Sequence, residues 1–477
     1  MRYHHVTTLA VGIVTLLTLG HPTRALQAPE RPNFVVIFAD DMGYGDLGAF
    51  GHPVFRTPNL DRLAAEGQRW TEFYAAASVC TPSRAGLLTG RYPIRSGMSG
   101  PRRVLFPDSG GGQPPSEITI AEALADAGYV SGAFGKWPLG HLPQFLPTRQ
   151  GFATYWGIPY SNDMDRVPGS PDHRAAAKAD PRWQADPANY QVPILHDETE
   201  IERPADQYTI TRRYTEQAVA FIREHREQPF FVYLAHSMMH IPLFASPEFQ
   251  GRSPAGLYGD AIEEVDWSVG QIVAALRDLG LDGRTLVVFT SDNGPWIVFD
   301  THGGSTGLLR GGKGDTYEGG MREPTIMWGP GIVAPGVVRD PGSTLDLLPT
   351  FVRLAGLEPP QDRVLDGYDL GPVLRGEGPS PRNEMFFYRA RRLFAARVGP
   401  YKAHFVTQSG YGGDPPVEHD PPQLYDLRSD PSERFDIAAR HPDVLERIRA
   451  RVDAHRATVE PVTDQLAIRI QPAVSER

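Results

Sequence analysis

Four short apolar runs punctuate the chain, and amphipathic stretches with glycine and proline loops separate them. The runs cover residues 34–39, 130–134, 230–235 and 286–290. Short, continuous apolar runs of this kind are typical of strands that are buried on both faces of a parallel sheet. Because helical patterns alternate with the runs, the sequence predicts an α/β fold built on one large, mostly parallel sheet.

Polar residues with versatile chemistry follow closely after each run. They are two carboxylates, a lysine, two histidines and an Asp-Asn pair: Asp40 and Asp41, Lys136, His236 and His240, and Asp292 and Asn293. The carboxyl ends of parallel strands lie along one edge of a sheet, and ligands of open α/β sheets bind in the crevice beside that edge. We therefore expect these side chains to share one crevice.

Helical periodicity fills much of the chain between the runs. The spacing of apolar residues predicts helices over residues 58–67, 118–128, 208–225 and 260–279. By contrast, residues 164–206 are polar and rich in proline, which predicts a long insertion loop rather than a domain.

The character of the sequence changes near residue 359. A stretch rich in proline and glycine leads to three strand-like pieces and a helix: 385–388, 393–398, 402–406 and 442–457. These features predict a smaller α+β domain over residues 359–477, after a larger domain over residues 29–358.

Composition and charge narrow the classes of function. The chain has 477 residues, of which 40% are hydrophobic and 22% are charged. These fractions are near the averages of globular proteins and exclude a disordered or coiled-coil chain. The formal net charge is −10, so the chain lacks the excess of basic residues that nucleic-acid binding requires, and we expect no nucleic-acid partner.

The N-terminus has the pattern of an export signal. Arg2 precedes an apolar stretch over residues 11–19, and Ala25 and Ala28 provide small residues for cleavage. This stretch is too short to span a bilayer, and no later segment approaches the roughly 18 apolar residues that a membrane helix needs. We therefore expect a signal peptide over residues 1–28 and an exported protein, periplasmic or secreted, with no stable membrane span.

The chain has one cysteine, Cys80, which excludes a disulfide within the chain. Pro82 and the residues that follow it, as far as a glycine, have the pattern of a helix start, which places Cys80 at a helix N-terminus. At such a position the pKa of a thiol is lowered and the thiol is reactive. The alternative for a lone cysteine is a small buried apolar residue.

The acidic and amide residues after the first and fourth runs offer only oxygen ligands. Asp40, Asp41, Asp292 and Asn293 therefore suit a hard cation such as Ca²⁺ better than Zn²⁺. For either pair alone, carboxylates that cap turns are the alternative. Lys313 lies in an Arg-Gly-Gly-Lys-Gly loop whose glycines permit close approach of the backbone, although a solvated surface lysine is the alternative there.

Residues 80–91 read Cys-Thr-Pro-Ser-Arg-Ala-Gly-Leu-Leu-Thr-Gly-Arg. This segment resembles the signature of the sulfatase family, C-x-P-S-R followed by L-T-G-R. Further segments extend the resemblance over most of the chain: residues 33–41, 135–137, 157–161, 240–242, 290–294 and 309–314. Order and spacing are similar to the arylsulfatase (arylsulfatase A-like) branch. The resemblance implies an alkaline-phosphatase-like α/β/α sandwich and the hydrolysis of aryl or carbohydrate sulfate monoesters to a phenol or alcohol and sulfate.

The resemblance also implies a modified residue and a metal ion. A formylglycine-generating or equivalent maturation enzyme would convert Cys80 to Cα-formylglycine. Ca²⁺ would be held by Asp40, Asp41, residue 80, Asp292 and Asn293. The implied catalytic residues are Cys80, Arg84, Lys136, His240 and Lys313, and the implied contacts to the small-molecule or glycan substrate are Lys136, Ser161, His240 and Lys313. In this scheme His240 protonates the leaving group, and Arg84 with the lysines stabilises charge on the sulfuryl group.

One position departs from the family pattern. The family motif Gly-Lys-Trp-His-Leu-Gly is Gly-Lys-Trp-Pro-Leu-Gly here, with Pro138 in place of the histidine that is thought to help expel sulfate. His141 is a candidate substitute. Two alternatives stay open: a sulfated-glycan binding protein with an impaired active site, and a phosphate or phosphonate ester hydrolase of the same superfamily, whose sites often use two zinc ions.

Overall fold

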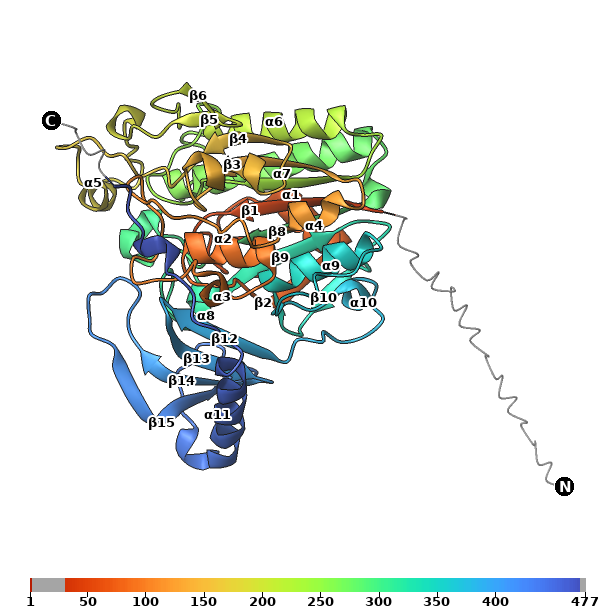
Figure 1. Ribbon diagram of the computed structural model, residues 1–477, viewed down its shortest axis with the longest axis vertical. Helices are drawn as coiled ribbons and strands as arrows, with labels where there is room; N and C mark the ends of the chain where they lie inside the picture. The colour runs from red at the N-terminus through yellow and green to blue at the C-terminus, as the bar shows by residue number, and fades with distance from the viewer. Residues whose placement is uncertain (2–30, 472–477) are drawn as a thin grey trace.

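The computed structural model describes residue 1 and residues 31–471 (Figure 1). The predicted signal peptide therefore lies outside the described residues except for Met1. Within the described part of the chain, no helix combines the length and the apolar character that a membrane span requires.

A mixed sheet of 11 strands forms the core of the described chain. Its strands are β1 (Asn33–Ala39), β2 (Gln68–Tyr74), β3 (Val130–Lys136), β4 (Thr154–Ile158), β5 (Ile194–His196), β6 (Thr199–Glu202), β7 (Phe230–Ala235), β8 (Thr285–Ser291), β9 (Arg322–Trp328), β10 (Gly336–Val338) and β11 (Gly342–Ser343). They lie in the order β10-β2-β9-β8-β1-β7-β3-β4-β5-β6, and β11 pairs with β2. The five central strands, from β8 to β4, are mutually parallel, which confirms the predicted sheet.

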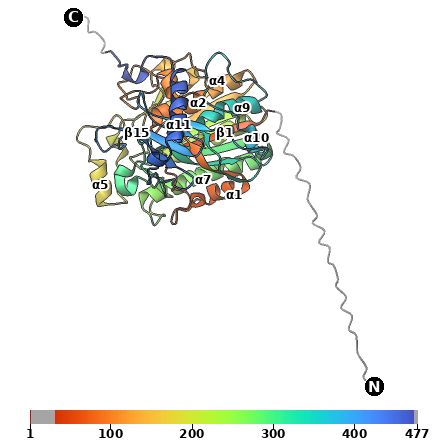
Figure 2. The ribbon, with the colours of Figure 1, turned by 90° about the horizontal axis from the view of Figure 1, so that it is seen from below.

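Helices cover both faces of this sheet (Figures 1 and 2). One face packs against α1 (Pro58–Glu66), α6 (Ile210–Glu224) and α7 (Leu257–Asp278), and the other against α2 (Cys80–Thr89), α4 (Ile120–Ala125) and α9 (Leu347–Leu354). The remaining helices are α3 (Pro93–Ser96), α5 (His173–Ala179), α8 (Glu318–Met321), α10 (Gly371–Leu374) and α11 (Pro442–Arg456).

Strand β1 shows why its sequence is apolar throughout. Val35 and Ile37 pack in the cluster with α6 and α7, whereas Phe34, Val36 and Phe38 pack in the cluster with α2, α4 and α9. Successive side chains of a strand point to opposite faces, so a strand between two helical layers needs apolar residues at every position. The α/β/α sandwich is thereby confirmed.

The insertion prediction for residues 164–206 is wrong in part. The segment contains α5, and β5 and β6 extend the main sheet, with Trp156 of β4 opposite His196 of β5. Tyr190, Val192 and Ile194 are buried in the cluster with α6 and α7, and they anchor the segment. Strands of three and four residues are too short to show a clear apolar period, which is why the sequence did not indicate them.

A second sheet follows the sandwich. Its four antiparallel strands are β12 (Glu384–Arg389), β13 (Arg392–Val398), β14 (Tyr401–Thr407) and β15 (Val417–Asp426), and α11 packs against β13 and β14. The sequence indicated all of these except β15, which contains Asp-Pro-Pro and lacks an apolar run. The chain then returns to the sandwich, where Leu466 is fully buried beside α2 and α4, and Gln465 N donates to Gly97 O at 2.9 Å.

Candidate active site

The register of the parallel strands brings the carboxyl ends of β1 and β8 together. Ala39 of β1 lies opposite Ser291 of β8, so Asp40 and Asp292 follow side by side. The backbone N–H of Asp41 donates to Asp292 Oδ1 at 3.2 Å, and all three carboxylates are at most 1% exposed. The carboxylates that follow β1 and β8 therefore lie together at this edge of the sheet, whereas His236, which the prediction also included, contacts α7 instead.

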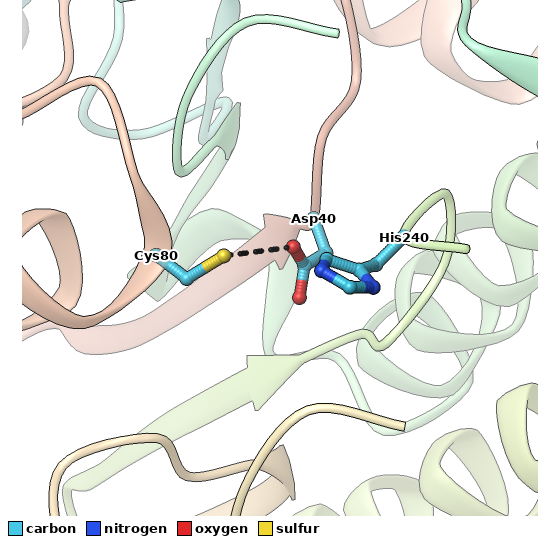
Figure 3. Close-up of side chains that lie close together, drawn as sticks. All are labelled: Asp40, Cys80 and His240. Atoms are coloured by element: carbon cyan, nitrogen blue, oxygen red, sulfur yellow. Dashed lines mark hydrogen bonds between the residues drawn. The ribbon is translucent and has the colours of Figure 1, made fainter. Parts of the chain in front are cut away.

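Helix α2 carries Cys80 into the same crevice. Cys80 is the first residue of the helix, after Val79 in extended conformation, and its side chain is 1% exposed. Its Sγ lies 3.5 Å from Asp40 Oδ1 and 3.5 Å from Lys136 Nζ (Figure 3 shows the contact with Asp40). Burial, and next the charge of Asp40, raise the pKa of the thiol well above its ordinary value. The prediction of an acidified thiol is therefore wrong, because these effects outweigh the helix N-terminus and Lys136.

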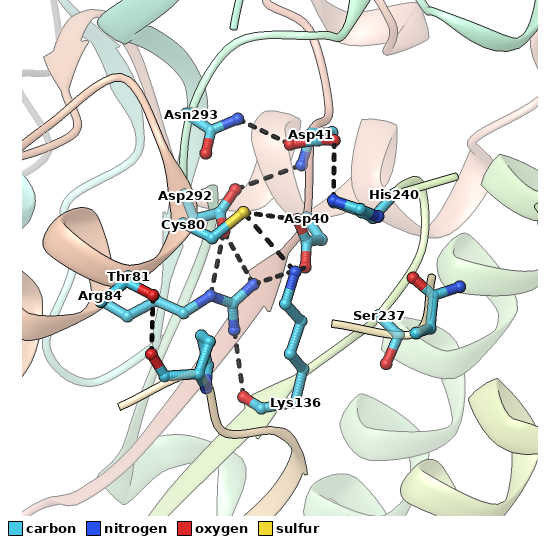
Figure 4. A network of polar contacts seen from close by, with 12 residues as sticks. Asp40, Asp41, Cys80, Thr81, Arg84, Lys136, Ser237, His240, Asp292 and Asn293 are labelled. Carbon is cyan, nitrogen blue, oxygen red and sulfur yellow. Dashed lines mark hydrogen bonds and ion pairs between the residues drawn. The ribbon is translucent and has the colours of Figure 1, made fainter. Parts of the chain in front are cut away.

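Three cationic side chains converge on the carboxylates, of which Figure 4 shows Arg84 and Lys136. Arg84, one turn along α2, donates to Asp292 Oδ2 at 2.9 Å and to Asp40 Oδ2 at 3.0 Å. Lys136, the last residue of β3, lies 2.5 Å from Asp40 Oδ2, and Lys313 lies 2.8 Å from Asp41 Oδ2. All three cations are buried. Such a group of fixed cations is suited to hold a tetrahedral anion and to stabilise charge that moves within it.

The pKa shifts of the carboxyl groups follow from this packing. Burial alone would raise the pKa of Asp40, but Lys136 and Arg84 outweigh it and hold the pKa below its usual range. Burial raises the pKa of Asp41 to about 7. The positive charge of Lys313 opposes this rise, whereas the charges of Asp40 and Asp292 add to it. Burial, and next Asp40, also raise the pKa of Asp292. The three carboxylates thus carry mutual repulsion that a further cation would relieve.

The donor set fits a hard metal ion. Ligand atoms of Asp40, Asp41, Cys80 and Asp292 all lie within 4.8 Å of one another. The amide of Asn293 donates from Nδ2 to Asp41 Oδ1 at 2.7 Å, while its buried Oδ1 accepts no hydrogen bond in the described structure. An orphaned acceptor beside three carboxylates is the environment that a cation with oxygen ligands satisfies. Sulfur is a poor ligand for such an ion, so an oxygen at position 80 would fit better.

His240 lies on the buried loop after β7. Its Nδ1 is 2.6 Å from Ile241 O, and its Nε2 is 3.9 Å from Asp41 Oδ2 (Figure 4). Burial, and next Lys313 and Lys136, hold the pKa of His240 well below its ordinary value. The ring is therefore neutral, with Nδ1–H donating to the carbonyl and Nε2 on the side of Asp41. A bound anion would offset the two lysines and favour protonation at Nε2.

Other predicted residues lie at different distances from this centre. Ser161 is buried on the loop after β4, but within the described chain its hydroxyl makes no hydrogen bond to Cys80 or the lysines. His236 contacts Ser268 Oγ of α7 through Nε2 at 3.1 Å, on the face of the sheet that α1, α6 and α7 cover. His141 packs its half-buried ring against Tyr160, with ring centroids 5.8 Å apart, so the structure gives it no contact with residue 80.

Pro138 lies close to the helix that carries Cys80. Its main-chain O accepts a hydrogen bond from Thr81 Oγ1 at 2.8 Å, and both residues are buried. This contact fixes the segment after β3 beside the residue that follows Cys80. A side chain with a proton-accepting nitrogen is missing at the place where the family motif would supply one.

Three residues near this centre were not identified from the sequence. The ring of Trp296 lies 4.1 Å from Lys313 Nζ and 5.3 Å from the His240 ring. Tyr411, from the loop between β14 and β15, packs against Trp296 with ring centroids 4.9 Å apart and the ring planes tilted by 47°. Asp163 has a buried Oδ1 without a hydrogen-bond partner; burial raises its pKa, and Lys136 and Lys313 oppose that effect. Asp163 lies two residues after Ser161, so the sequence segment that identified Ser161 could also have identified Asp163.

Comparison with known proteins places this geometry in context. The family described as "Sulfatase" matches residues 32–357, and the one described as "C-terminal region of aryl-sulfatase" matches residues 380–475. Arylsulfatase A from Homo sapiens is 45% identical over 448 residues, covering 89% of this chain and 87% of the relative. N-acetylgalactosamine-6-sulfatase from Sus scrofa is 40% identical and covers 94% and 90%. The solved structure of Ps i-CgsB in complex with k-i-k-neocarrahexaose superimposes with a TM-score of 0.76 at 30% identity, covering 92% of this chain and 95% of that one.

Proposed function

This chain belongs to the sulfatase family and is a sulfuric ester hydrolase, and we propose that it works through a Cα-formylglycine made from Cys80 beside a bound Ca²⁺. The observation that carries the proposal is the orphaned Asn293 Oδ1 next to three buried carboxylates and residue 80. In this proposal Asp40, Asp41, Asp292 and Asn293 hold the ion, and an oxygen of the modified residue 80 replaces Sγ as a ligand. Once bound, the ion would polarise a sulfate oxygen and a hydroxyl of the hydrated aldehyde.

The cations hold the sulfate group in this scheme. Lys136 and Lys313 bind its oxygens, and both are positioned by the carboxylates with which they pair. Arg84 lies between Asp40 and Asp292, where it orients these two ligands and favours an ionised hydroxyl at residue 80. Because all three cations are buried, their charges act in a medium of low dielectric and gain strength.

His240 is the proposed general acid. Its Nδ1–H is held by Ile241 O, which leaves Nε2 to carry the transferable proton. Binding of an anionic ester counteracts the two lysines that lower its pKa, so the ring gains a proton when substrate is present. It then gives that proton to the departing phenol or alcohol.

Several broader statements belong to the same proposal. A formylglycine-generating or equivalent enzyme is the maturation partner, and the substrate is an aryl or carbohydrate sulfate ester. The protein is exported through the signal peptide at residues 1–28. The catalytic domain spans residues 29–358 and the smaller domain residues 359–477; Lys313 and Tyr411 then come from different domains and meet at the crevice.

Pro138 favours one second candidate, a sulfated-glycan binding protein that turns over slowly or not at all. The third reading, a phosphate or phosphonate ester hydrolase with two zinc ions, has no comparable support. In the described chain, both groupings of metal-ligating side chains share Asp40 and Cys80, which is one site and not two.

Mass spectrometry combined with sulfate release tests the proposal. The protein is expressed with a formylglycine-generating enzyme, and the tryptic peptide from Trp70 to Arg84 is weighed. We expect it to be roughly 18 Da lighter than its unmodified form. The modified protein should release sulfate continuously from 4-nitrophenyl sulfate, lose this activity in a chelator and regain it with Ca²⁺.

Cys80→Ala is the matched control, and it should show neither the mass change nor turnover. An unmodified thiol in an active protein would contradict the formylglycine scheme. A modified protein that binds sulfated glycans but releases no more than one equivalent of sulfate would favour the second candidate.

A further inference from the structure

Two arginines meet at one edge of the crevice without an acidic partner. Arg103, from the segment after α3, and Arg389, at the end of β12, both donate to Gly410 O, at 2.8 and 3.2 Å. Arg389 also donates to Gln408 O and Ser409 O, at 3.1 and 2.8 Å. Among the described residues, neither guanidinium forms an ion pair with a carboxylate. Carbonyl groups therefore satisfy some of their N–H donors, whereas Asp315 and Asp414 offset the charge of Arg389 only from beyond ion-pair distance.

The surroundings of Arg389 show the effect of this arrangement. Burial, and next the charge of Arg103, lower the pKa of Arg389 to about 10. The nearby carboxylates are occupied by backbone donors: Asp315 Oδ2 accepts from Gly312 N at 2.9 Å, and Asp414 Oδ2 accepts from Ser409 N at 3.0 Å. An additional anion between the guanidinium groups would reduce their repulsion.

A pocket lies where such an anion would sit. Arg103 and Arg389 line it together with residues from the start of α2 and with Gly314, the neighbour of Lys313. The enclosed part of the pocket is small, with about 20 Å³ open to the centre of a water-sized sphere, and the rest is open to solvent. A sulfate or a carboxylate would therefore bind at the open mouth, between the two guanidinium groups, with its sugar in the solvent beyond.

Aromatic rings connect the arginines to the proposed general acid. The guanidinium of Arg103 lies 4.6 Å from the centre of the Tyr411 ring, and that ring packs at a tilt against Trp296. The Trp296 ring in turn lies 5.3 Å from the His240 ring. The leaving group of the ester departs from the side of His240. A ring that extends from there along the two aromatic faces would bring its substituents towards Arg103.

We propose that Arg103 and Arg389 form a second anion site, which binds a further sulfate or carboxylate group on the leaving group of the substrate. The preferred substrates are then polyanionic esters, such as saccharides with more than one sulfate, and this assignment rests on the proposed function. Tyr411 and Trp296 form the wall between the cleaved sulfate and the second anion. The smaller unit contributes Arg389 and Tyr411, so it takes a direct part in substrate selection.

Matched substrates test the site. We compare pairs of disaccharides that carry the same cleavable sulfate and differ by a second sulfate, placed at each available position in turn. The wild-type kcat/KM should be at least tenfold higher for one disulfated member than for its monosulfated partner. This ratio should fall at least tenfold in Arg103→Met and in Arg389→Met, and less in Arg389→Lys. Arg391→Met, which removes an exposed arginine from the same turn, should keep the ratio.

Two kinetic outcomes would overturn the proposal. One is a wild-type ratio near one for every pair. The other is an equal loss of kcat/KM for both members of a pair, because that result is expected if the arginines only hold the loop at residues 408–410.

Binding measurements distinguish a substrate-borne sulfate from free sulfate at this site. They also test the second anion site independently of the proposed function. Calorimetry with Cys80→Ala follows the desulfated product that keeps only the second sulfate, and inorganic sulfate is the free probe. We expect the product Kd to weaken at least tenfold in both arginine-to-methionine variants. Weaker binding of inorganic sulfate with unchanged product binding would contradict a site for a substrate-borne group. If the modified protein hydrolyses no sulfate ester, the proposed function fails, and unchanged product binding would then overturn the second site independently.

Discussion

Residue 138 departs from the family motif, and its position makes the departure testable. Pro138 O accepts from Thr81 Oγ1, so the residue lies beside the neighbour of Cys80. A histidine there would supply a proton acceptor for the release of sulfate, and such assistance is worth about 10²-fold or more. We expect Pro138→His to raise kcat about 10²-fold with little change in KM, as measured by steady-state sulfate release.

Pro138→Ala is the matched control, because it removes the ring of proline without adding an imidazole. No gain in Pro138→His would mean that another group already performs this step. An equal gain in both variants would attribute the effect to the backbone and contradict the catalytic explanation.

The candidate site residues that directly follow an apolar run could be identified from the sequence. Asp40 and Asp292 were identified because parallel strands end at one edge, and the register of β1 and β8 places them together. Trp296, on the loop after β8, and Tyr411 were not, because the contact between them depends on a loop of the second sheet that carries Tyr411. The pKa of Cys80 was mispredicted for a related reason: the local helix start was visible, but the burial and the neighbouring carboxylate that dominate it depend on the tertiary structure.

Among the elements, long helices and central strands were predicted well, and edge elements were not. Helix α4 begins two residues later than its apolar pattern indicates, because Thr119 and Glu122 form a capping box at its start. Strands β5, β6 and β15 lie at or near the edges of their sheets and lack long apolar runs. Their pairing is decided by neighbouring strands, so local sequence carries little information about them.

Helix α11 holds a histidine that makes the stability of its packing depend on pH. His455 stacks on Phe386 of β12, with ring centroids 3.9 Å apart, and its Nε2 lies 3.0 Å from the Tyr388 hydroxyl. Burial lowers its pKa to about 4, although Asp366 opposes the shift. The unfolded chain, with a pKa of about 6.5 for histidine, therefore binds more protons between pH 6.5 and 4, and stability falls as the pH is lowered through this window.

Replacing this histidine should flatten that pH dependence. Between pH 7.5 and 5, His455 lowers the free energy of unfolding by about 2 kcal/mol. We expect His455→Gln to reduce the loss between these pH values by about that amount in urea unfolding. His196→Gln, at an exposed position, should leave the loss unchanged. The same pH dependence in His455→Gln and wild type would contradict the assignment.

Across the whole molecule, a buried cluster of charges joins the sandwich to the second sheet. Lys402 of β14 lies 2.9 Å from Glu318 of α8 and 3.2 Å from Glu433, and all three side chains are fully buried. Burial alone would raise the pKa of Glu318, but Lys402 and neighbouring arginines hold it at about 2. Lys402 is thus the cation that both glutamates share, beside Arg322 at Glu318 and His404 at Glu433.

Removal of this lysine should destabilise the protein strongly. Lys402→Met removes the cation that both buried carboxylates share and leaves Glu318 with Arg322 and Glu433 with His404. We expect it to lower the free energy of unfolding by about 3 kcal/mol. Adding Glu318→Gln to the same variant should restore part of this loss. Urea unfolding of the two variants provides the measurement; a double variant less stable than Lys402→Met would show that charge compensation is not the cause.

The burial of Cys80 limits the time during biosynthesis in which an enzyme could reach this residue. All ten residues of α2 are buried, and β8 with the candidate metal ligands Asp292 and Asn293 that follow it is synthesised some 200 residues after Cys80. At ribosomal speeds of about 5–20 residues per second, roughly 10–40 s pass between the synthesis of Cys80 and that of Asp292 and Asn293. If Cys80 is converted to formylglycine as proposed, the maturation enzyme would reach it during that delay, before the folded chain buries the cysteine. Conditions that accelerate translation or early folding would then yield folded molecules that keep the unmodified thiol.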